Sequence, residues 1–324
     1  MSMRLTRKMA LTLVGAIAVV VATGLLLAAV PQSPRGDGLT PVKKIGTFDR
    51  GFGHLEYAAG VFAGNGKVYV ADTGNHRILE LNEEGRPTRQ WGGMPGTQTK
   101  DTAEAEMYFQ KDMEAAKSGD LYVADTMNHR IVQFGPDGRF IRAFGGLGNG
   151  PGKLMCPYGV TVTENAVIVA DTMAHRIVVF DRDGNYIRRW GTFGTRPGQF
   201  QFPHDVAVDS RGAIYATDMV NHRIQKFSPE GRLLRTWGGF GSQDGKFNYP
   251  WGISVDNEDG IWVADMGNYR VQKFSTAGEH LLSYGRPGTG PGEFTRPKGI
   301  SVDDDGNLWV ADSGVQKIAH LRIN

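Results

Sequence analysis

Short apolar segments separated by polar turns recur along most of the chain. In Asp205–Asp209 apolar and polar side chains alternate, and a turn at Ser210–Ala213 separates this segment from the apolar Ile214–Thr217. Arg223–Phe227 and Arg232–Trp237 follow after a tight turn and a Pro-Glu-Gly turn. Alternation and short apolar runs are typical of β-strands, so this unit is predicted to contain four short strands.

The same unit is repeated six times. Its best-preserved segment covers Val70–Ile78, Val123–Ile131, Val169–Ile177, Ala216–Ile224, Val263–Val271 and Val310–Ile318. The aspartates of these copies are spaced 53, 46, 47, 47 and 47 residues apart. Four-stranded units of about 40–50 residues are blades of a β-propeller, because one sheet cannot bury both faces until neighbours pack on it. The sequence therefore predicts an all-β, six-bladed propeller over residues 41–324.

The two ends of the repeat region are predicted to pair with each other. After the sixth copy, Gln316–Asn324 is long enough for a third strand but not for a fourth. Pro41–Phe48 resembles the outer strand of other units, such as Arg232–Gly238, and no inner strand precedes it. We therefore expect residues 41–48 to form the outermost strand of the last blade, which closes the ring and removes an exposed sheet edge.

The run from Asp to Asn-His-Arg-Ile, followed by Asp-Gly turns and a Gly-rich stretch, resembles the NHL repeat over about residues 41–324. Ala174 replaces Asn in the third copy, and Val315, Gln316 and Lys317 replace Asn-His-Arg in the sixth. The resemblance implies a six-bladed propeller. The family includes RNA-binding tripartite-motif proteins, extracellular sensor domains of membrane kinases and peptidyl-hydroxyglycine amidating lyases, and the fold alone does not choose among them.

An uncharged run of 22 residues, 9–30, precedes the repeats. As a helix it is about 33 Å long, enough to cross a bilayer core of roughly 30 Å. The basic leader, residues 1–8, is expected to stay in the cytoplasm. A retained signal anchor and a cleaved signal peptide remain open, and the anchor is favoured because Leu27 stands where a cleavage site needs a small residue. Residues 31–40 are then a linker, and the propeller is membrane-anchored on the extracytoplasmic (periplasmic or extracellular) side.

Composition adds two restrictions to this picture. The net charge is +2, but Arg4, Arg7 and Lys8 of the leader supply +3, so the rest of the chain is close to neutral. A near-neutral propeller argues against nucleic acid as a partner. The single cysteine, Cys156, cannot close an intramolecular disulfide.

The histidines of the motif are not expected to bind a metal. His76, His129, His175 and His222 stand at equal positions in successive blades, so they lie on a circle and cannot converge on one ion. We expect a structural lock instead, in which the motif Asp and Asn satisfy backbone amides of the turn and the motif Arg pairs with Asp.

Candidate binding residues are those that differ between copies on a face where side chains can converge. At the start of the six innermost strands stand Ala59, Lys111, Tyr158, His204, Trp251 and Lys298. They are expected to surround the mouth of the central channel, and aromatic and charged side chains together suit recognition of a protein, peptide or glycan. The motif turns add Met127, Met173, Met219 and Met266, either as adaptable contacts on the same face or as filling between blades.

Metal-assisted chemistry is the alternative for the channel mouth. The amidating lyases place several histidines there in a Pro-His context, which His204 alone reproduces. A calcium site needs clustered carboxylates. Asp112 and Asp205 replace glycines of other copies, but blades two and four are not adjacent, so they are expected to lie apart. Glu114 either pairs with Lys111 or faces the channel. No cofactor is therefore expected, and calcium or zinc at these residues is the alternative.

The predicted function is that of a membrane-tethered, extracytoplasmic NHL propeller that binds a protein or ligand without catalysis, as a scaffold or sensor. The alternative is a metal-assisted lyase or hydrolase with its site at the channel mouth.

Overall fold

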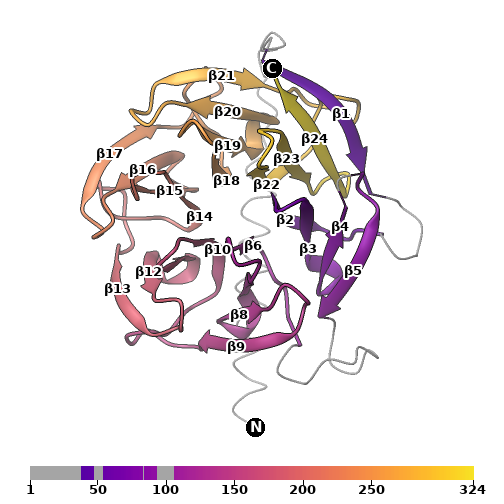
Figure 1. The fold of residues 1–324 in the computed structure, drawn as a ribbon. Coiled ribbons are helices and arrows are strands. Elements are labelled where there is room, and N and C mark those ends of the chain that lie inside the picture. Colours follow the sequence, from indigo (N-terminus) through magenta and orange to yellow (C-terminus); the bar gives the residue numbers. More distant parts are fainter. Residues whose placement is uncertain (1–37, 47–53, 83, 93–105) are drawn as a thin grey trace. The chain divides into compact units, whose positions relative to one another are not determined.

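The computed structural model describes residues 38–46, 54–82, 84–92 and 106–324. In this part of the chain, 24 strands form six four-stranded antiparallel sheets, which are arranged as blades around a central axis (Figure 1). The first strand of each blade lies nearest the axis and the fourth lies on the rim (Figure 1). The all-β, six-bladed architecture predicted from the repeat is confirmed.

Blades 1 to 5 are meanders of consecutive strands. Blade 1 contains β2 (Ala58–Gly64), β3 (Lys67–Asp72), β4 (Arg77–Leu81) and β5 (Pro87–Gly92). Blade 2 contains β6 (Met113–Ala115), β7 (Leu121–Asp125), β8 (Arg130–Phe134) and β9 (Phe140–Gly145). Blade 3 contains β10 (Pro157–Val162), β11 (Val167–Asp171), β12 (Arg176–Phe180) and β13 (Tyr186–Trp190). Blade 4 contains β14 (Pro203–Val208), β15 (Ile214–Asp218), β16 (Arg223–Phe227) and β17 (Leu233–Gly238), and blade 5 contains β18 (Pro250–Val255), β19 (Ile261–Asp265), β20 (Arg270–Phe274) and β21 (His280–Tyr284).

Blade 6 combines the two ends of the repeat region. It contains β22 (Pro297–Val302), β23 (Leu308–Asp312), β24 (Lys317–Ile323) and, as its outer strand, β1 (Leu39–Ile45). β1 pairs antiparallel with β24, from Leu39 opposite Ile323 to Ile45 opposite Ile318. Residues 47 and 48 of the expected closing strand lie outside the described residues. A strand from before blade 1 thus covers the edge that blade 6 would otherwise expose.

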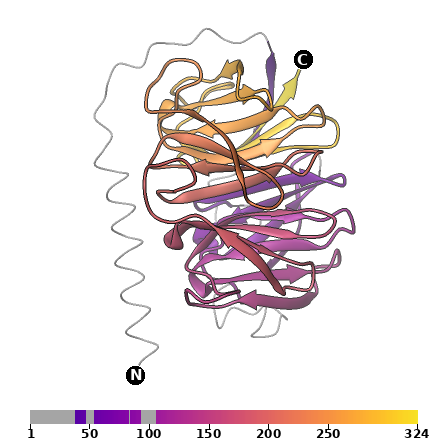
Figure 2. The same ribbon diagram turned by 90° about the vertical axis from the view of Figure 1, so that its left-hand side faces the viewer.

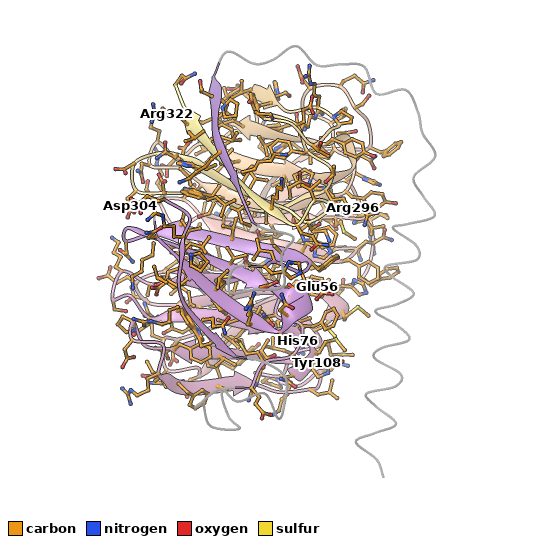
Figure 3. All side chains as sticks on the ribbon, turned by 90° about the vertical axis from the view of Figure 1, so that its right-hand side faces the viewer. Glu56, His76, Tyr108, Arg296, Asp304 and Arg322 are labelled. Carbon is orange, nitrogen blue, oxygen red and sulfur yellow. The ribbon has the colours of Figure 1, made fainter. Side chains whose placement is uncertain are left out.

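The propeller has two faces of different composition. The motif turns, which include the short 3-10 segments η1 (Thr73–Asn75), η3 (Thr126–Asn128), η4 (Thr172–Ala174) and η5 (Met266–Asn268), lie on the face that we call the motif face. The loops of blades 2 to 5 that lead from an outer strand to the next inner strand lie on the same face. Figure 3 shows His76 and Arg296 on the motif face, and Asp304 and Arg322 on the opposite face. Because Leu39 pairs with Ile323, the chain before Leu39 joins the propeller at the opposite face.

The hydrophobic core lies between the blades, which stand side by side in the view of Figure 2. One buried cluster joins Ile168 and Ile177 of blade 3 to Val206 and Phe227 of blade 4. Equivalent clusters lie at the other interfaces, and the one between blades 5 and 6 includes Leu39 of β1. The second strands of blades 2 to 6 are buried along their whole length because neighbouring blades pack on both sides of them. A single copy therefore cannot bury its apolar faces alone.

The expected membrane segment, residues 9–30, and the basic leader, residues 1–8, lie outside the described residues. Within the part of the chain that the structure describes, no helix has the length and apolar character needed to cross a bilayer.

Candidate functional site

The motif aspartate is the centre of a hydrogen-bonded lock in each regular blade. In blade 4, the carboxylate of Asp218 accepts hydrogen bonds from the backbone N–H of Gln201 (2.7 Å), from Asn221 Nδ2 (2.9 Å) and from Arg223 Nε (2.7 Å). The same arrangement surrounds Asp265 in blade 5, where burial raises the pKa of the carboxyl group to about 6 although Arg270 opposes this shift. The motif Asp, Asn and Arg thus form the structural lock that we expected.

The motif arginine also holds the loop that leads into its own blade. Arg223 donates hydrogen bonds to the carbonyl oxygens of Thr195 (2.7 Å), Arg196 (2.9 Å) and Gln199 (2.7 Å). Asn221 Nδ2 donates to the carbonyl of Gly194 (2.9 Å) in the same loop. Because the acceptors are backbone carbonyls, the motif fixes the path of the loop and not the identity of its side chains.

The motif histidine holds the following loop. His175 Nδ1 accepts a hydrogen bond from the backbone N–H of Phe202 (3.1 Å), and His222 Nδ1 accepts one from Tyr249 (3.1 Å). His76 and His129 make the same contact to the next blade. Burial lowers the pKa of all four imidazoles, which agrees with a neutral ring that accepts at Nδ1. The sequence argument set aside a metal role for these residues but did not find this tie between blades.

At the channel mouth, three of the expected binding residues form one aromatic stack. The rings of His204 and Trp251 are stacked with their centroids 3.9 Å apart. Tyr158 approaches His204 edge-on at 4.6 Å. These residues come from blades 3, 4 and 5, so the stack spans half of the channel mouth.

Two lysines and Tyr57 complete this ring of side chains, which we call the mouth ring. Lys298 Nζ lies 4.3 Å from the ring centroid of Trp251 and 3.9 Å from that of Tyr57, and it donates a hydrogen bond to the Tyr57 hydroxyl. Lys111 Nζ lies 4.7 Å from the centroid of Tyr57 and 5.6 Å from that of Tyr158. Such contacts attract a cation to the face of an aromatic ring. The mouth ring thus closes on itself.

The sequence argument missed Tyr57 and named Ala59 at the same place. Ala59 is buried and has no side chain that could reach across the mouth. Tyr57, two residues earlier, fills the space instead. A useful signal was the alanine itself, because the smallest member of a set of large side chains leaves room that another residue must fill.

Four of the six side chains of the mouth ring are buried. The exposed fractions of Lys111, Tyr158, His204 and Lys298 are 8%, 6%, 3% and 2%, and Tyr57 and Trp251 are partly exposed. Burial lowers the pKa of Lys111 to about 8, and burial with the neighbouring Lys111 lowers that of Lys298 far below its usual value. Burial and the two lysines also lower the pKa of His204 strongly, so its imidazole is neutral. Its Nδ1 is buried without a hydrogen-bond partner among the described residues.

Two aspartates lie just inside the channel, and our expectation that they lie apart is wrong. The carboxyl groups of Asp112 and Asp205 interact directly although they belong to blades 2 and 4. The inner strand of blade 3 lies between them with Gly159, where a Cβ atom would be 2.4 Å from Asp205 Oδ1. The inner strands converge towards the axis, and the missing side chain leaves room for the pair.

Burial keeps a proton on this carboxyl pair near neutral pH. It raises the pKa of Asp205 to about 7 and, together with the Asp205 carboxylate, raises that of Asp112 well above its usual value. The same carboxyl groups also accept hydrogen bonds from the backbone. Asp112 Oδ2 accepts one from the N–H of Val160 (3.2 Å), and Asp205 Oδ2 accepts one from the N–H of Ile253 (2.9 Å).

Glu114 faces the channel. It lines a cavity of about 130 Å³ together with Thr161, Ser254 and Ser301. Burial raises the pKa of its carboxyl group to about 7, and the neighbouring Thr161 side chain and Val162 N–H oppose this shift. The structure gives it no ion pair with Lys111 within the described ranges. In that part of the chain no three His, Cys, Asp or Glu side chains lie close enough to hold one ion.

The four methionines of the motif turns fall into two groups. Met219 and Met266 are buried, with 1% and 6% of their surface exposed. Met127 and Met173 are partly exposed on the motif face. The set therefore contains two residues that fill gaps and two that lie on the surface.

Comparison with known proteins was made for sequence and for structure. A model of the NHL repeat matches residues 200–227, 247–274 and 294–321. The RING finger protein nhl-1 of Caenorhabditis elegans is 35% identical over 89 residues, which are 28% of this chain and 8% of that protein. The chain thus spans less than a tenth of the length of this relative.

Solved propeller structures cover most of the chain. A streptogramin B lyase is 18% identical with a TM-score of 0.60, covering 90% of this chain and 100% of that one. A virginiamycin B lyase from Staphylococcus aureus is 16% identical with a TM-score of 0.57, covering 88% and 99%. A protein of unknown function from Bacteroides thetaiotaomicron is 17% identical with a TM-score of 0.65, covering 91% and 84%. At these identities the likeness shows the fold alone. The chain thus contains three recognised NHL repeats within a six-bladed propeller, as the resemblance seen in the sequence implied.

Proposed function

We propose that this chain is a non-catalytic binding module, a scaffold or sensor, that engages a protein partner on its motif face. The proposal includes a membrane tether through residues 9–30 and an extracytoplasmic propeller, which follow from the uncharged run and the basic leader. Nucleic acid is not part of the proposal, because the chain after the basic leader is close to neutral.

The closed mouth ring is the observation that carries this proposal. An enzyme site needs reactive groups that face a space where a substrate can lie. Here six side chains contact one another, and four of them are buried while Tyr57 and Trp251 are partly exposed: Tyr57, Lys111, Tyr158, His204, Trp251 and Lys298. The ring therefore closes the channel on the motif face, which becomes a surface for a large partner.

The alternative is a lyase or hydrolase that uses His204, Asp205, Asp112 and Glu114. One observation favours it, because the buried Nδ1 of His204 has no partner among the described residues. This alternative predicts one equivalent of a divalent metal in the purified full chain, and its loss in His204→Ala. Our proposal predicts the same metal content, below one tenth of an equivalent, in both proteins.

The binding proposal is tested by photo-crosslinking of the full chain in its source cells. A benzoylphenylalanine replaces either Thr195, exposed on the motif face, or Glu258, exposed in a turn on the opposite face. We expect one defined protein adduct from position 195 and none from position 258. An adduct from position 258 alone, or none from either, would contradict the proposal.

A further inference from the structure

Three loops on the motif face each expose one large apolar side chain. The exposed fractions are 50% for Leu147, 61% for Phe193 and 72% for Phe240. The three residues occupy the same position of successive copies, two residues after the glycine that follows or ends the outer strand. We call them the apolar arc. Large exposed apolar residues that gather on one face mark interaction sites.

The apolar arc is held in a fixed shape. Leu147, Phe193 and Phe240 form isolated backbone bridges with Leu154, Phe200 and Phe247, whose side chains are fully buried. The ring of Phe193 lies 4.9 Å from that of His175, and the ring of Phe240 lies 5.0 Å from that of His222. The motif arginines bind the backbone of the same loops. A partner would thus lose little free energy in ordering these anchors.

Each loop of the arc also carries an exposed cation: Lys153, Arg196 or Lys246. None of the three forms an ion pair in the described parts of the chain. The one acidic residue in these loops, Asp244, is already paired with Arg270 at 3.3 Å. The charge beside the apolar arc is therefore positive, and its complement is a carboxylate.

We propose that the apolar arc binds a polypeptide segment that combines apolar side chains with Asp or Glu. This inference rests on the proposed function and names the chemistry of its partner. Charge complementarity favours a polypeptide of this kind. The carboxylates of such a segment can meet the three exposed cations while its apolar side chains cover Leu147, Phe193 and Phe240.

Selection from a phage library of random 12-residue peptides, with the purified full chain in detergent as bait, tests the inference. We expect enrichment of peptides that contain at least two aromatic or aliphatic residues and a net negative charge. Binding of a selected peptide, measured by fluorescence polarisation, should weaken at least ~10-fold in a variant with Phe193→Ser and Phe240→Ser. The charge reversal Lys246→Glu should weaken it several-fold at low salt only.

A matched control removes two apolar side chains from the rim. Leu234 and Leu281, on β17 and β21, are 45% and 55% exposed, so Leu234→Ser with Leu281→Ser should leave peptide affinity unchanged. All variants should keep the melting temperature of the parent. Basic selected peptides, equal affinity in the Phe variant, or no enrichment at all would overturn the inference. So would Phe-dependent binding to vesicles of phosphatidylcholine and phosphatidylglycerol, or Phe-dependent dimerisation. A crosslinked partner at position 195 without peptide selection would refute this inference and leave the proposed function intact.

Discussion

In blades 5 and 6 the motif aspartate is paired with a positively charged side chain, but the side chain comes from different parts of the chain in the two blades. In blade 5, Arg270 binds Asp265 through Nε (2.8 Å) and donates to the carbonyl of Lys246 (2.9 Å). In blade 6 the motif arginine is replaced by Lys317. There Lys44 of β1 lies 3.6 Å from Asp312 and donates to the carbonyl of Glu293 (2.7 Å), which is equivalent to that of Lys246.

This difference shows that the ion pair at the motif aspartate can be kept even when its cation comes from a distant segment of the chain. Lys44 brings its charge from the other end of the propeller, so forming the lock of blade 6 also closes the ring. Burial lowers the pKa of Lys44, and the neighbouring Asp312 opposes this shift. The sixth copy can therefore depart from the motif without leaving its aspartate alone, since the closing strand supplies the cation.

The largest effect is expected from removing the closing strand. Deletion of residues 39–45 from the full chain should lower the melting temperature by about 10 °C or more, because blade 6 loses a whole strand, the Leu39 contact and Lys44. Differential scanning calorimetry measures this. Deletion of residues 31–37, of equal length, is the control and should change the melting temperature by less than ~2 °C. Equal melting curves for the two deletions would show that β1 does not close the ring.

The second effect compares the two cations directly. Arg270→Met leaves a buried carboxylate without its partner and should cost about 3–5 kcal/mol in urea unfolding. Lys44→Met should cost about 1–3 kcal/mol, because its ion pair with Asp312 is longer. The exposed Arg211→Met is the control and should stay within ~0.5 kcal/mol. If Lys44→Met behaves like this control, Lys44 does not replace the motif arginine.

The third prediction is a rescue inside blade 6. Lys317→Arg restores the motif residue, so it should recover at least about half of the stability lost in Lys44→Met, while changing the parent by less than ~0.5 kcal/mol. Urea unfolding of the two single variants and the double variant gives the coupling energy. If the changes in the free energy of unfolding are strictly additive, the arginine introduced by Lys317→Arg does not replace Lys44 as the partner of Asp312.

The smallest expected effect is a pH-dependent loss of local stability. It should occur where a motif histidine accepts a hydrogen bond from the next blade and not where this histidine is absent. The pKa of His175 and His222 is lowered on folding, so the stability that these groups contribute is present above about pH 6.5 and is lost as the pH falls through the folded value. At pH 5, hydrogen exchange of the Phe202 and Tyr249 amides should lose about tenfold in protection after correction for intrinsic rates. The Arg296 amide, which donates to Asp312 at 2.7 Å, is the internal control and should keep its protection. Equal changes at all three amides would rule out the histidine tie.

The sequence was sufficient for features that repeat. The periodic aspartates predicted the six blades, and the lone outer-type strand before the first copy indicated how β1 pairs with β24. It also placed the mouth residues at equivalent positions, and Lys111, Tyr158, His204, Trp251 and Lys298 do meet in the structure.

Contacts between inner strands near the central axis could not be predicted from the repeated sequence pattern. Whether Asp112 reaches Asp205 across blade 3 depends on how closely the inner strands approach at Gly159, and spacing along the chain does not give that distance. Likewise, the burial of the mouth ring follows from Tyr57 crossing the position of Ala59. The exposure of Phe193 and Phe240 was missed because aromatic residues next to glycines look like ordinary core residues in sequence.

The hydrogen bonds between the motif arginines and the loop backbone have a consequence for the evolution of this protein. Arg223 and its equivalents bind carbonyl oxygens, which every amino acid provides. Mutations at the three positions of the apolar arc, 147, 193 and 240, therefore alter the outer surface of a loop without removing these hydrogen bonds. Under the proposed function, variants could exchange one partner for another at these three sites while the blades beneath them stay the same, so that specificity and stability could evolve separately.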